Sequence, residues 1–244
     1  MKMVDPNEKV NEIVDPNFWL IEDCPSKFKL YKDNKIYGRR LTVPEVKKLS
    51  EMNEENGNSV IRSILSNSIK GIDVDDIIVA DKIYLIFWLR ANTYREQGYE
   101  TRFKCNLCKK EGEYEFTLEH LKVNYINDDF DKISRIPIEK DIRISYCTIA
   151  TYDEMIKAKE IKDIDEDILD YAANVKIENL GLMEKYKFIA DLDPTDYCKL
   201  ETYIKKYQIG VQNFIEIKCR NCGGMAQSGI TFRTDFFIPQ YKFN

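Results

Sequence analysis

Histidine and glycine are scarce in this chain, and each shortage argues against a class of active site. The 244 residues include one histidine, His120, and ten glycines. A nucleophile that depends on histidine as its base would therefore have a single candidate, and no nucleophile elbow lies near it. A lone histidine is more often a surface or capping residue. The chain also has no glycine-rich phosphate loop of the usual patterns, so we expect a protein that is not an enzyme.

Long apolar runs are missing as well. The longest apolar stretch lies around Ile83–Leu89, far short of the roughly 18 residues that a membrane-spanning helix needs. The N-terminal residues contain no apolar segment of the kind that signal peptides carry. We therefore expect a soluble, cytosolic protein without a membrane span. In a reducing compartment, paired cysteines favour a metal site over disulfides.

An excess of positive charge is also absent, which bears on the partners of the chain. The formal net charge is -5, and 32% of the residues are charged. This balance gives no general attraction to phosphate backbones, so nucleic acid is a disfavoured partner. Hydrophobic residues make up 43% of the chain, which is long enough to bury a core as one large domain or two small ones.

The first part of the chain contains signals for three helices. Thr42 and Glu45 have the spacing of a capping box, which predicts a helix start. Apolar residues at helical spacing predict a second helix over residues 60–69 and a third over residues 82–95. The third helix is the strongest core candidate, and its buried face would carry Tyr84, Phe87, Trp88 and Ala91.

Alternating apolar and polar residues predict β-structure around two pairs of cysteines. Residues 99–118 have the pattern of a hairpin with one cysteine pair at its turn, and residues 214–232 repeat this arrangement around a second pair. Another β segment is expected over residues 141–149. Residues 151–208 are mostly helical in pattern, so they would form an insertion between the two hairpins.

The predicted fold class is α+β, with a four-cysteine zinc ribbon split into two β-hairpins, an N-terminal helical segment and a helical insertion. We expect the chain to divide into an N-terminal arm (1–24), a helical region (25–98), a first ribbon hairpin with β segments (99–150), a helical insertion (151–210), and a second hairpin with a C-terminal tail (211–244). The tail ends in the apolar sequence Phe-Phe-Ile-Pro, which either packs on its own domain or inserts into a neighbour.

The paired cysteines are the strongest chemical signal in the sequence. Cys105 and Cys108 form one Cys-x-x-Cys pair, and Cys219 and Cys222 form the other. Two residues between cysteines let both sulfurs face one point in a tight turn, and two such turns supply four thiolates to a tetrahedral Zn²⁺. Iron suits the same ligands and is an alternative metal. Redox dithiols or disulfides are disfavoured, because neither pair opens a helix after a strand.

The residues next to the pairs fit a charged centre. Five cations flank the cysteines and could offset the negative charge of a zinc tetrathiolate: Lys104, Lys109, Lys110, Lys218 and Arg220. Gly223 follows the second pair and permits a positive φ, which frees backbone N–H groups toward sulfur. Lys109 holds the equivalent place after the first pair, so we expect a less favourable turn there. The remaining thiols, Cys24, Cys147 and Cys198, are expected to be small buried hydrophobes.

Several stretches together resemble the T4-like phage baseplate hub family. They are Leu41–Glu45, Asp81–Arg90, the Cys105/Cys108 pair, the Cys219/Cys222 pair and Phe236–Pro239. The resemblance spans roughly residues 25–240 and implies a baseplate hub component or hub-assembly factor of a contractile tail. It implies no catalytic residue.

The first functional hypothesis is therefore a non-enzymatic structural or assembly protein of the baseplate hub, stabilised by structural zinc. Its partners would be other baseplate and tail hub proteins in a hetero- or homo-oligomeric assembly, in the virion tail or in the host cytoplasm during assembly. A zinc-ribbon nucleic-acid binder, with the five flanking cations facing phosphates, is the alternative. An iron-binding electron-transfer protein with the same four ligands is a third hypothesis.

Overall fold

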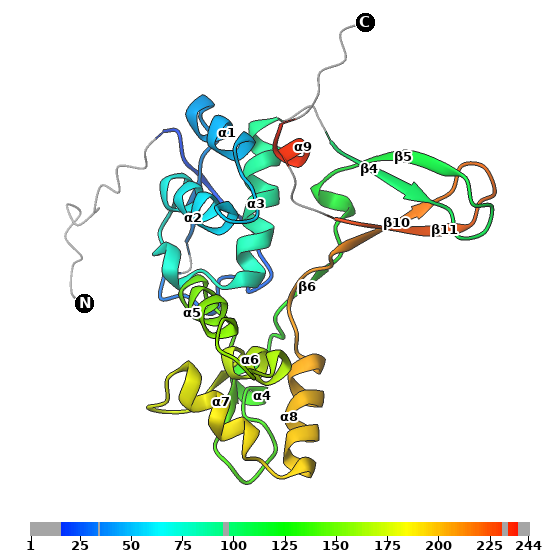
Figure 1. Cartoon of the computed structure of the whole chain (residues 1–244). Coiled ribbons are helices and arrows are strands. Elements are labelled where there is room, and N and C mark those ends of the chain that lie inside the picture. Colours follow the sequence, from blue (N-terminus) through cyan, green and yellow to red (C-terminus); the bar gives the residue numbers. More distant parts are fainter. Residues whose placement is uncertain (1–15, 34, 95–97, 231–233, 239–244) are drawn as a thin grey trace, which may run out of the picture.

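The computed structural model describes residues 16–33, 35–94, 98–230 and 234–238. The chain is mixed helix and sheet, with small antiparallel sheets. Figure 1 shows two helical lobes, one above the other, and an arm of two hairpins that projects to the side. Most of the predicted N-terminal arm and the last residue of the expected tail motif, Pro239, lie outside the described residues.

The first lobe contains three longer helices, a short C-terminal helix and a three-stranded sheet. Its elements are β1 (Trp19–Leu20), β2 (Tyr37–Gly38), α1 (Val43–Ser50), α2 (Gly57–Ser68), β3 (Ile69–Lys70), the 3-10 helix η1 (Val74–Asp76), α3 (Val79–Thr93) and α9 (Thr234–Phe237). The strands pair antiparallel in the order β1-β2-β3. The predicted helix starts agree with the structure within a few residues.

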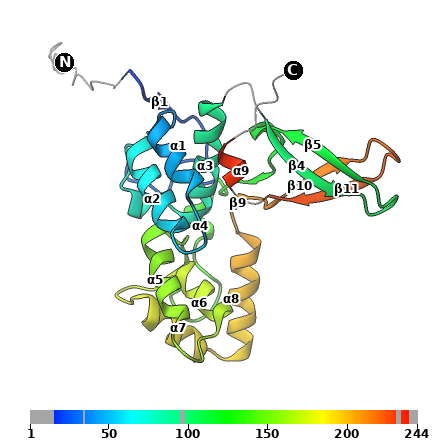
Figure 2. The same cartoon turned by 45° about the horizontal axis from the view of Figure 1, so that its top comes forward.

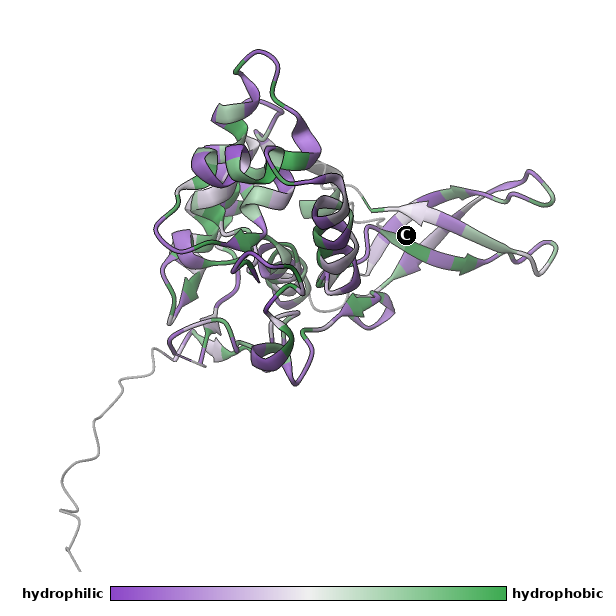
Figure 3. Cartoon of the chain, turned by 90° about the horizontal axis from the view of Figure 1, so that it is seen from below, coloured by the Kyte–Doolittle hydropathy of each residue, from purple (hydrophilic) through white to green (hydrophobic). Residues whose placement is uncertain are grey.

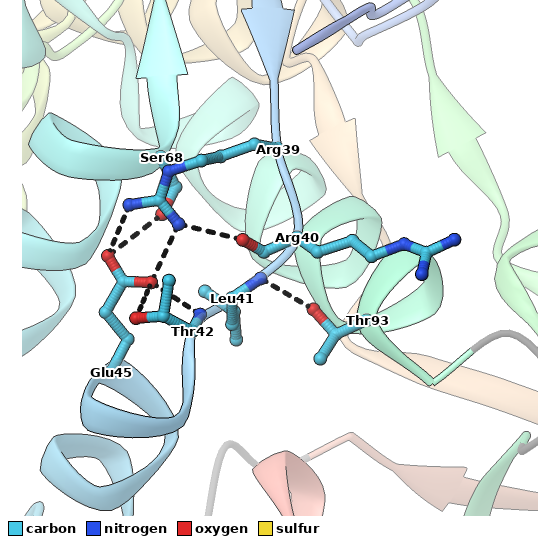
Figure 4. A network of polar contacts seen from close by, with 7 residues as sticks. All are labelled: Arg39, Arg40, Leu41, Thr42, Glu45, Ser68 and Thr93. Carbon is cyan, nitrogen blue, oxygen red and sulfur yellow. Dashed lines mark hydrogen bonds and ion pairs between the residues drawn. The ribbon is translucent and has the colours of Figure 1, made fainter. Parts of the chain in front are cut away.

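A network of polar contacts fixes the start of α1 (Figure 4). The Glu45 carboxylate accepts a hydrogen bond from the Thr42 backbone N–H at 2.8 Å. This is one of the two hydrogen bonds of a capping box, the one that the N3 side chain accepts from the N-cap backbone. The carboxylate also receives two hydrogen bonds from the Arg39 guanidinium, at 2.7 and 2.9 Å. Glu45 is almost fully buried, so this bidentate ion pair connects β2 to α1 inside the lobe.

Helix α3 is the central element of the molecule. Leu85 and Ile86 are buried in the core of the first lobe, against α1 and α2. Phe87 is fully buried in a different cluster, at the base of the arm. Of the predicted buried face, Tyr84 and Phe87 are buried, but Trp88 and Ala91 are only half-buried. The prediction is also incomplete, because α3 packs through residues outside that face, such as Leu85 and Ile86.

The second lobe is built from α4 (Phe130–Ile133), β7 (Arg143–Ile144), α5 (Ile149–Lys159), α6 (Glu166–Ala173), β8 (Val175–Lys176), α7 (Leu182–Ala190) and α8 (Pro194–Lys206). Its core contains Leu169, Ala172 and Leu200, all fully buried. Asp193 caps α8, since its carboxylate accepts the N–H groups of two residues in the first turn. The expected β segment over residues 141–149 is reduced to β7, which pairs with β8.

Backbone and charged contacts join the two lobes. The Val79 N–H donates to the Cys147 carbonyl at 2.8 Å, so the start of α3 is bonded to the chain just before α5. On the surface, Arg62 of α2 forms ion pairs with Asp75 of η1 and Asp153 of α5.

The arm consists of two antiparallel hairpins that lie side by side (Figure 2). The first pairs β4 (Tyr99–Lys104) with β5 (Glu111–Phe116), and the second pairs β10 (Phe214–Lys218) with β11 (Met225–Gly229). Near the body, the 3-10 helix η2 (Leu118–His120) follows β5, and β6 (Val123–Asn124) pairs with β9 (Gly210–Val211). Each hairpin agrees with its prediction from alternation.

The base of the arm is anchored on α3 by aromatic rings and one buried cation. Tyr99 packs edge-on against Phe87, with ring centroids 5.2 Å apart, and its hydroxyl donates to the Phe87 carbonyl at 2.7 Å. Arg90 is only 2% exposed. Its guanidinium donates to the Gly98 carbonyl at 3.1 Å and to the Phe236 carbonyl, so it joins α3, the arm and α9.

The C-terminal aromatic pair packs on its own chain. Phe237 is 2% exposed and belongs to the core of the first lobe. The Phe236 ring stacks on Tyr99 at 5.1 Å between centroids. The alternative expectation, that these two rings insert into a neighbouring protein, is therefore wrong, because they are already used to attach α9 to the base of the arm.

Candidate metal centre

The two cysteine pairs lie in turns that repeat the same backbone hydrogen bonds. In the first hairpin, the Cys105 N–H donates to the Lys110 carbonyl at 2.9 Å, and the Lys109 N–H donates to the Cys105 carbonyl at 3.0 Å. In the second, the Cys219 N–H donates to the Gly224 carbonyl, and the Gly223 N–H donates to the Cys219 carbonyl, both at 2.8 Å. Two stretches far apart in the sequence thus build one local structure twice.

Both turns contain a residue in the left-handed region at the same place. The φ angle is +61° at Lys109 and +74° at Gly223. Glycine adopts this conformation without steric cost, whereas for a residue with a Cβ the conformation costs about 1 kcal/mol or more of stability. The expectation of a less favourable first turn is thus consistent with the structure, which adopts the required conformation despite the lysine.

The four sulfurs converge on one point at the tip of the arm. The Cys105 and Cys222 sulfurs are 3.6 Å apart, and those of Cys108 and Cys219 are 3.8 Å apart. All four lie within 4.8 Å of one another. Four sulfurs at about 2.3 Å from a tetrahedral Zn²⁺ would be about 3.8 Å apart. The residues therefore fit a metal ion of this kind, and the four thiols are not paired as disulfides.

Backbone N–H groups and the neighbouring thiols determine the acidity of the cluster. The N–H of Lys110 is the largest cause that lowers the pKa of Cys108, to about 6, and N–H groups of Cys108 and Leu107 lower the pKa of Cys105. The N–H of Gly224 acts in the same direction on Cys222, but hydrogen bonds with neighbouring sulfurs outweigh it and raise the pKa to about 11. A metal ion that bound to these thiols would displace their remaining protons.

Polar side chains link the two hairpins along the arm. At the tip, the Lys110 ammonium donates to the Asn221 side-chain oxygen at 2.8 Å. Halfway down, the Thr101 and Ser228 hydroxyls are 2.8 Å apart, and Ser228 donates to the Arg102 carbonyl at 3.0 Å. The sequence analysis did not identify these contacts, because each depends on which residues of two distant hairpins face each other. The five predicted flanking cations are all exposed.

The remaining thiols and the lone histidine lie outside this cluster. Cys24 and Cys147 are buried, as expected, but Cys198 is exposed, so the prediction that it is buried is wrong. Cys198 lies two positions before the buried Leu200 on α8, and residues two apart in a helix point to opposite sides. His120 is exposed and caps η2, where its Nδ1 lies 3.2 Å from the Thr117 N–H.

A buried carboxylate in the first lobe was also missed by the sequence analysis. Asp81 is 1% exposed and accepts the Ser26 N–H at 2.9 Å. The Ser26 and Tyr31 hydroxyls donate to it at 2.5 Å, and Cys24 lies 3.4 Å away. Burial raises the pKa of Asp81, while these hydrogen bonds oppose the rise. The cluster attaches the segment before β2 to the start of α3, and it lies far along the chain from the cysteine site.

Comparison with known proteins assigns the chain to a family. No curated protein and no solved structure matches the sequence. Over the part of the chain that the structure describes, no helix is long and apolar enough to cross a membrane. The family model for the T4 bacteriophage base plate protein matches residues 24–237, which include both lobes and all four clustered cysteines. The chain therefore belongs to the T4 bacteriophage base plate protein family and is a structural component of the virion's tail.

Proposed function

We propose that this chain is a non-enzymatic structural or assembly protein of the baseplate hub, and that one zinc ion holds its arm together. The ligands would be Cys105, Cys108, Cys219 and Cys222. The observation that supports this proposal best is the convergence of four sulfurs within 4.8 Å from two separate hairpins. Four protein thiolates leave no open coordination position, so the metal would be structural.

The shape of the arm explains why a metal would be needed. An isolated two-stranded hairpin is at best marginally stable in water. Here the base of each hairpin packs against α3, but the turns stand clear of both helical lobes (Figure 2). An ion at the tip would bind both turns and add to the polar contacts that link the two hairpins, so that the arm would form one rigid projection. A rigid projection suits a protein that works by contacting other baseplate and tail hub proteins in an oligomeric assembly, in the virion or in the host cytoplasm during assembly.

Elemental analysis of the purified protein tests the metal. We expect one zinc per chain in the wild-type protein and a large loss of zinc in Cys222→Ser. Cys198→Ser is the matched control, because Cys198 is exposed and lies outside the cluster, and it should retain the wild-type zinc content. Iron at the same ligands would give a coloured protein, so an iron absorption spectrum without zinc would contradict the proposal.

The hub assignment has a separate test. The tagged chain would be recovered from infected cells together with its bound proteins, and those proteins would be identified by mass spectrometry. Co-purification with tail hub proteins supports the assignment. A chain that is recovered as a free monomer, without any baseplate component, would refute it whatever its metal content.

A further inference from the structure

Two apolar side chains are exposed at the tip of the arm. Leu107, at the end of the first turn, is 72% exposed, and Met225, directly after the second turn, is 56% exposed. Leu107 reaches across to the other hairpin: a Cβ placed on Gly224 would lie 2.4 Å from its Cδ1 atom. The inner side of Leu107 thus covers the second turn, while its outer side faces away from the chain. Figure 3 shows hydrophobic colouring interrupting the hydrophilic ends of both hairpins.

Five exposed cations lie in or next to the two turns that carry these side chains. Lys109, Lys110 and Arg220 belong to the turns, while Lys104 and Lys218 end the strands β4 and β10. None of these cations takes part in an ion pair in the described part of the chain. By contrast, the half-buried Arg39 and Arg62 of the first lobe are paired with carboxylates. The tip cations are therefore available to an external partner.

The charge of the tip is opposite to that of the rest of the chain. Residues 104–111 and 218–225 contain these five cations and one carboxylate, Glu111, a local charge of +4. The whole chain carries -5, so everything outside the tip carries -9. A zinc tetrathiolate would add about -2 and still leave the tip positive.

We propose that the tip of the arm docks into an apolar recess ringed by carboxylates on a neighbouring baseplate protein. Leu107 and Met225 enter the recess, and the surrounding lysines and arginine contact its acidic rim. An apolar centre within a charged rim is the usual anatomy of a protein interface. This inference rests on the proposed metal-held arm, because the two apolar side chains come from different hairpins and need a fixed relative position.

The composition of the tip favours a protein partner over a nucleic acid. Proteins that bind single strands stack bases on aromatic side chains, and residues 104–111 and 218–225 contain no aromatic residue. Two exposed aliphatic side chains gain nothing from contact with phosphates, whereas in a protein recess they would lose their exposed apolar surface. The acidic remainder of the chain would also repel a phosphate backbone.

The geometry of the arm suits insertion into such a recess. A six-residue strand such as β4 spans about 20 Å, which places the tip well away from the two lobes. Since the base is anchored by Tyr99 and Arg90, the tip would lose little conformational freedom when it docks.

Binding measurements test the surface directly. The probe is tail precursors purified from infections that lack this chain, and the readout is the dissociation constant of the purified full-length protein. Leu107→Ser combined with Met225→Ser should weaken binding about tenfold or more, and Lys109→Glu should weaken it with a reduced salt dependence. The matched controls are Val43→Ser, an exposed apolar residue on α1, and Lys187→Glu, an exposed lysine on α7. Both should bind within twofold of wild type.

Zinc content is measured on every variant, so the two proposals fail separately. Absence of zinc from the wild-type protein refutes the proposed metal and leaves the binding data interpretable. Tip variants that retain zinc and bind as tightly as wild type overturn the docking proposal.

A photoreactive phenylalanine analogue at position 107 identifies the class of partner. We expect a cross-link to another baseplate protein, within a peptide rich in aspartate and glutamate. Cross-links only to nucleic acid, only to other copies of this chain, or to no molecule would overturn the inference.

Discussion

The Arg39–Glu45 ion pair should contribute a measurable and pH-dependent part of the stability of the first lobe. Burial disfavours the charged form of Glu45, but hydrogen bonds from Arg39 and from Thr42 outweigh that effect and lower its pKa from 4.5 to about 2. Because Glu45 is almost fully buried, the difference converts to about 3 kcal/mol of stabilisation of the folded state at neutral pH. Glu45→Gln keeps the size of the side chain and removes its charge, so we expect a loss of about 2–3 kcal/mol at pH 7.

Urea unfolding, followed by the fluorescence of the two tryptophans, Trp19 and Trp88, both in the same lobe, measures this loss. A carboxyl group with a lowered pKa stabilises the fold above its ordinary pKa of 4.5, and this stabilisation is lost as the pH falls through about 2. The difference between wild type and Glu45→Gln should therefore shrink steadily between pH 4.5 and pH 2. Both proteins have the same cysteines, so any effect of acid on the cysteine cluster cancels in the comparison.

The control is Glu51→Gln, at the exposed end of the same helix, which should change the free energy of unfolding by less than about 0.5 kcal/mol. The reasoning is refuted if Glu45→Gln is as stable as wild type at pH 7. It is also refuted if the difference between them stays constant as the pH falls below 4.5.

Three further predictions concern the proposed metal, two glycines in different conformations and the buried carboxylate. Removing metal with a strong chelator should accelerate amide hydrogen exchange in the two cysteine turns while α3 stays protected; equal acceleration in both would contradict a metal that acts only at the tip. Gly71→Ala should destabilise the protein by at least about 1 kcal/mol, since φ is +93° and the new Cβ would lie 2.3 Å from the Lys35 carbonyl oxygen. Gly57→Ala, at the start of α2, is the control and should be neutral or stabilising. The urea midpoints of the two variants test this difference, and equal midpoints would contradict it. Asp81→Asn should lower stability by about 2–4 kcal/mol in the same assay, because an amide NH₂ would face hydroxyl and N–H donors; a midpoint near that of wild type would show that the cluster is dispensable.

The features that the sequence predicted well are those that short-range physics determines. The Thr42–Glu45 capping box lies within one helical turn, and alternation identified both cysteine hairpins because a strand exposes every second side chain. The spacing of each cysteine pair predicts that its two sulfurs lie together in a tight turn, and two such pairs together predict one shared four-sulfur site. In the structure, the four sulfurs of the two pairs are in one cluster.

The features that were missed depend on contacts between distant segments. Arg90 directly follows the apolar run Ile83–Leu89 of α3, and its carbonyl partners come from residue 98 and from α9. A cation at the end of an apolar run is a visible signal of a buried polar contact, but nothing in the sequence indicates its partners. Cys198 is a different case, because the helical stripe through Leu200 already placed it on another side of α8. Helical periodicity therefore indicates that Cys198 is exposed, although apolar residues lie near it in the sequence.

The positions of the two hairpins in the sequence also determine when the arm can form during synthesis. Its two halves are separated by the whole second lobe, with 110 residues between Cys108 and Cys219. During synthesis the first hairpin cannot form the four-cysteine cluster until the second hairpin has also been made. The second lobe can fold during that interval, and the arm forms last. A product terminated before β10 would therefore have both helical lobes' longer helices but only two of the four clustered cysteines.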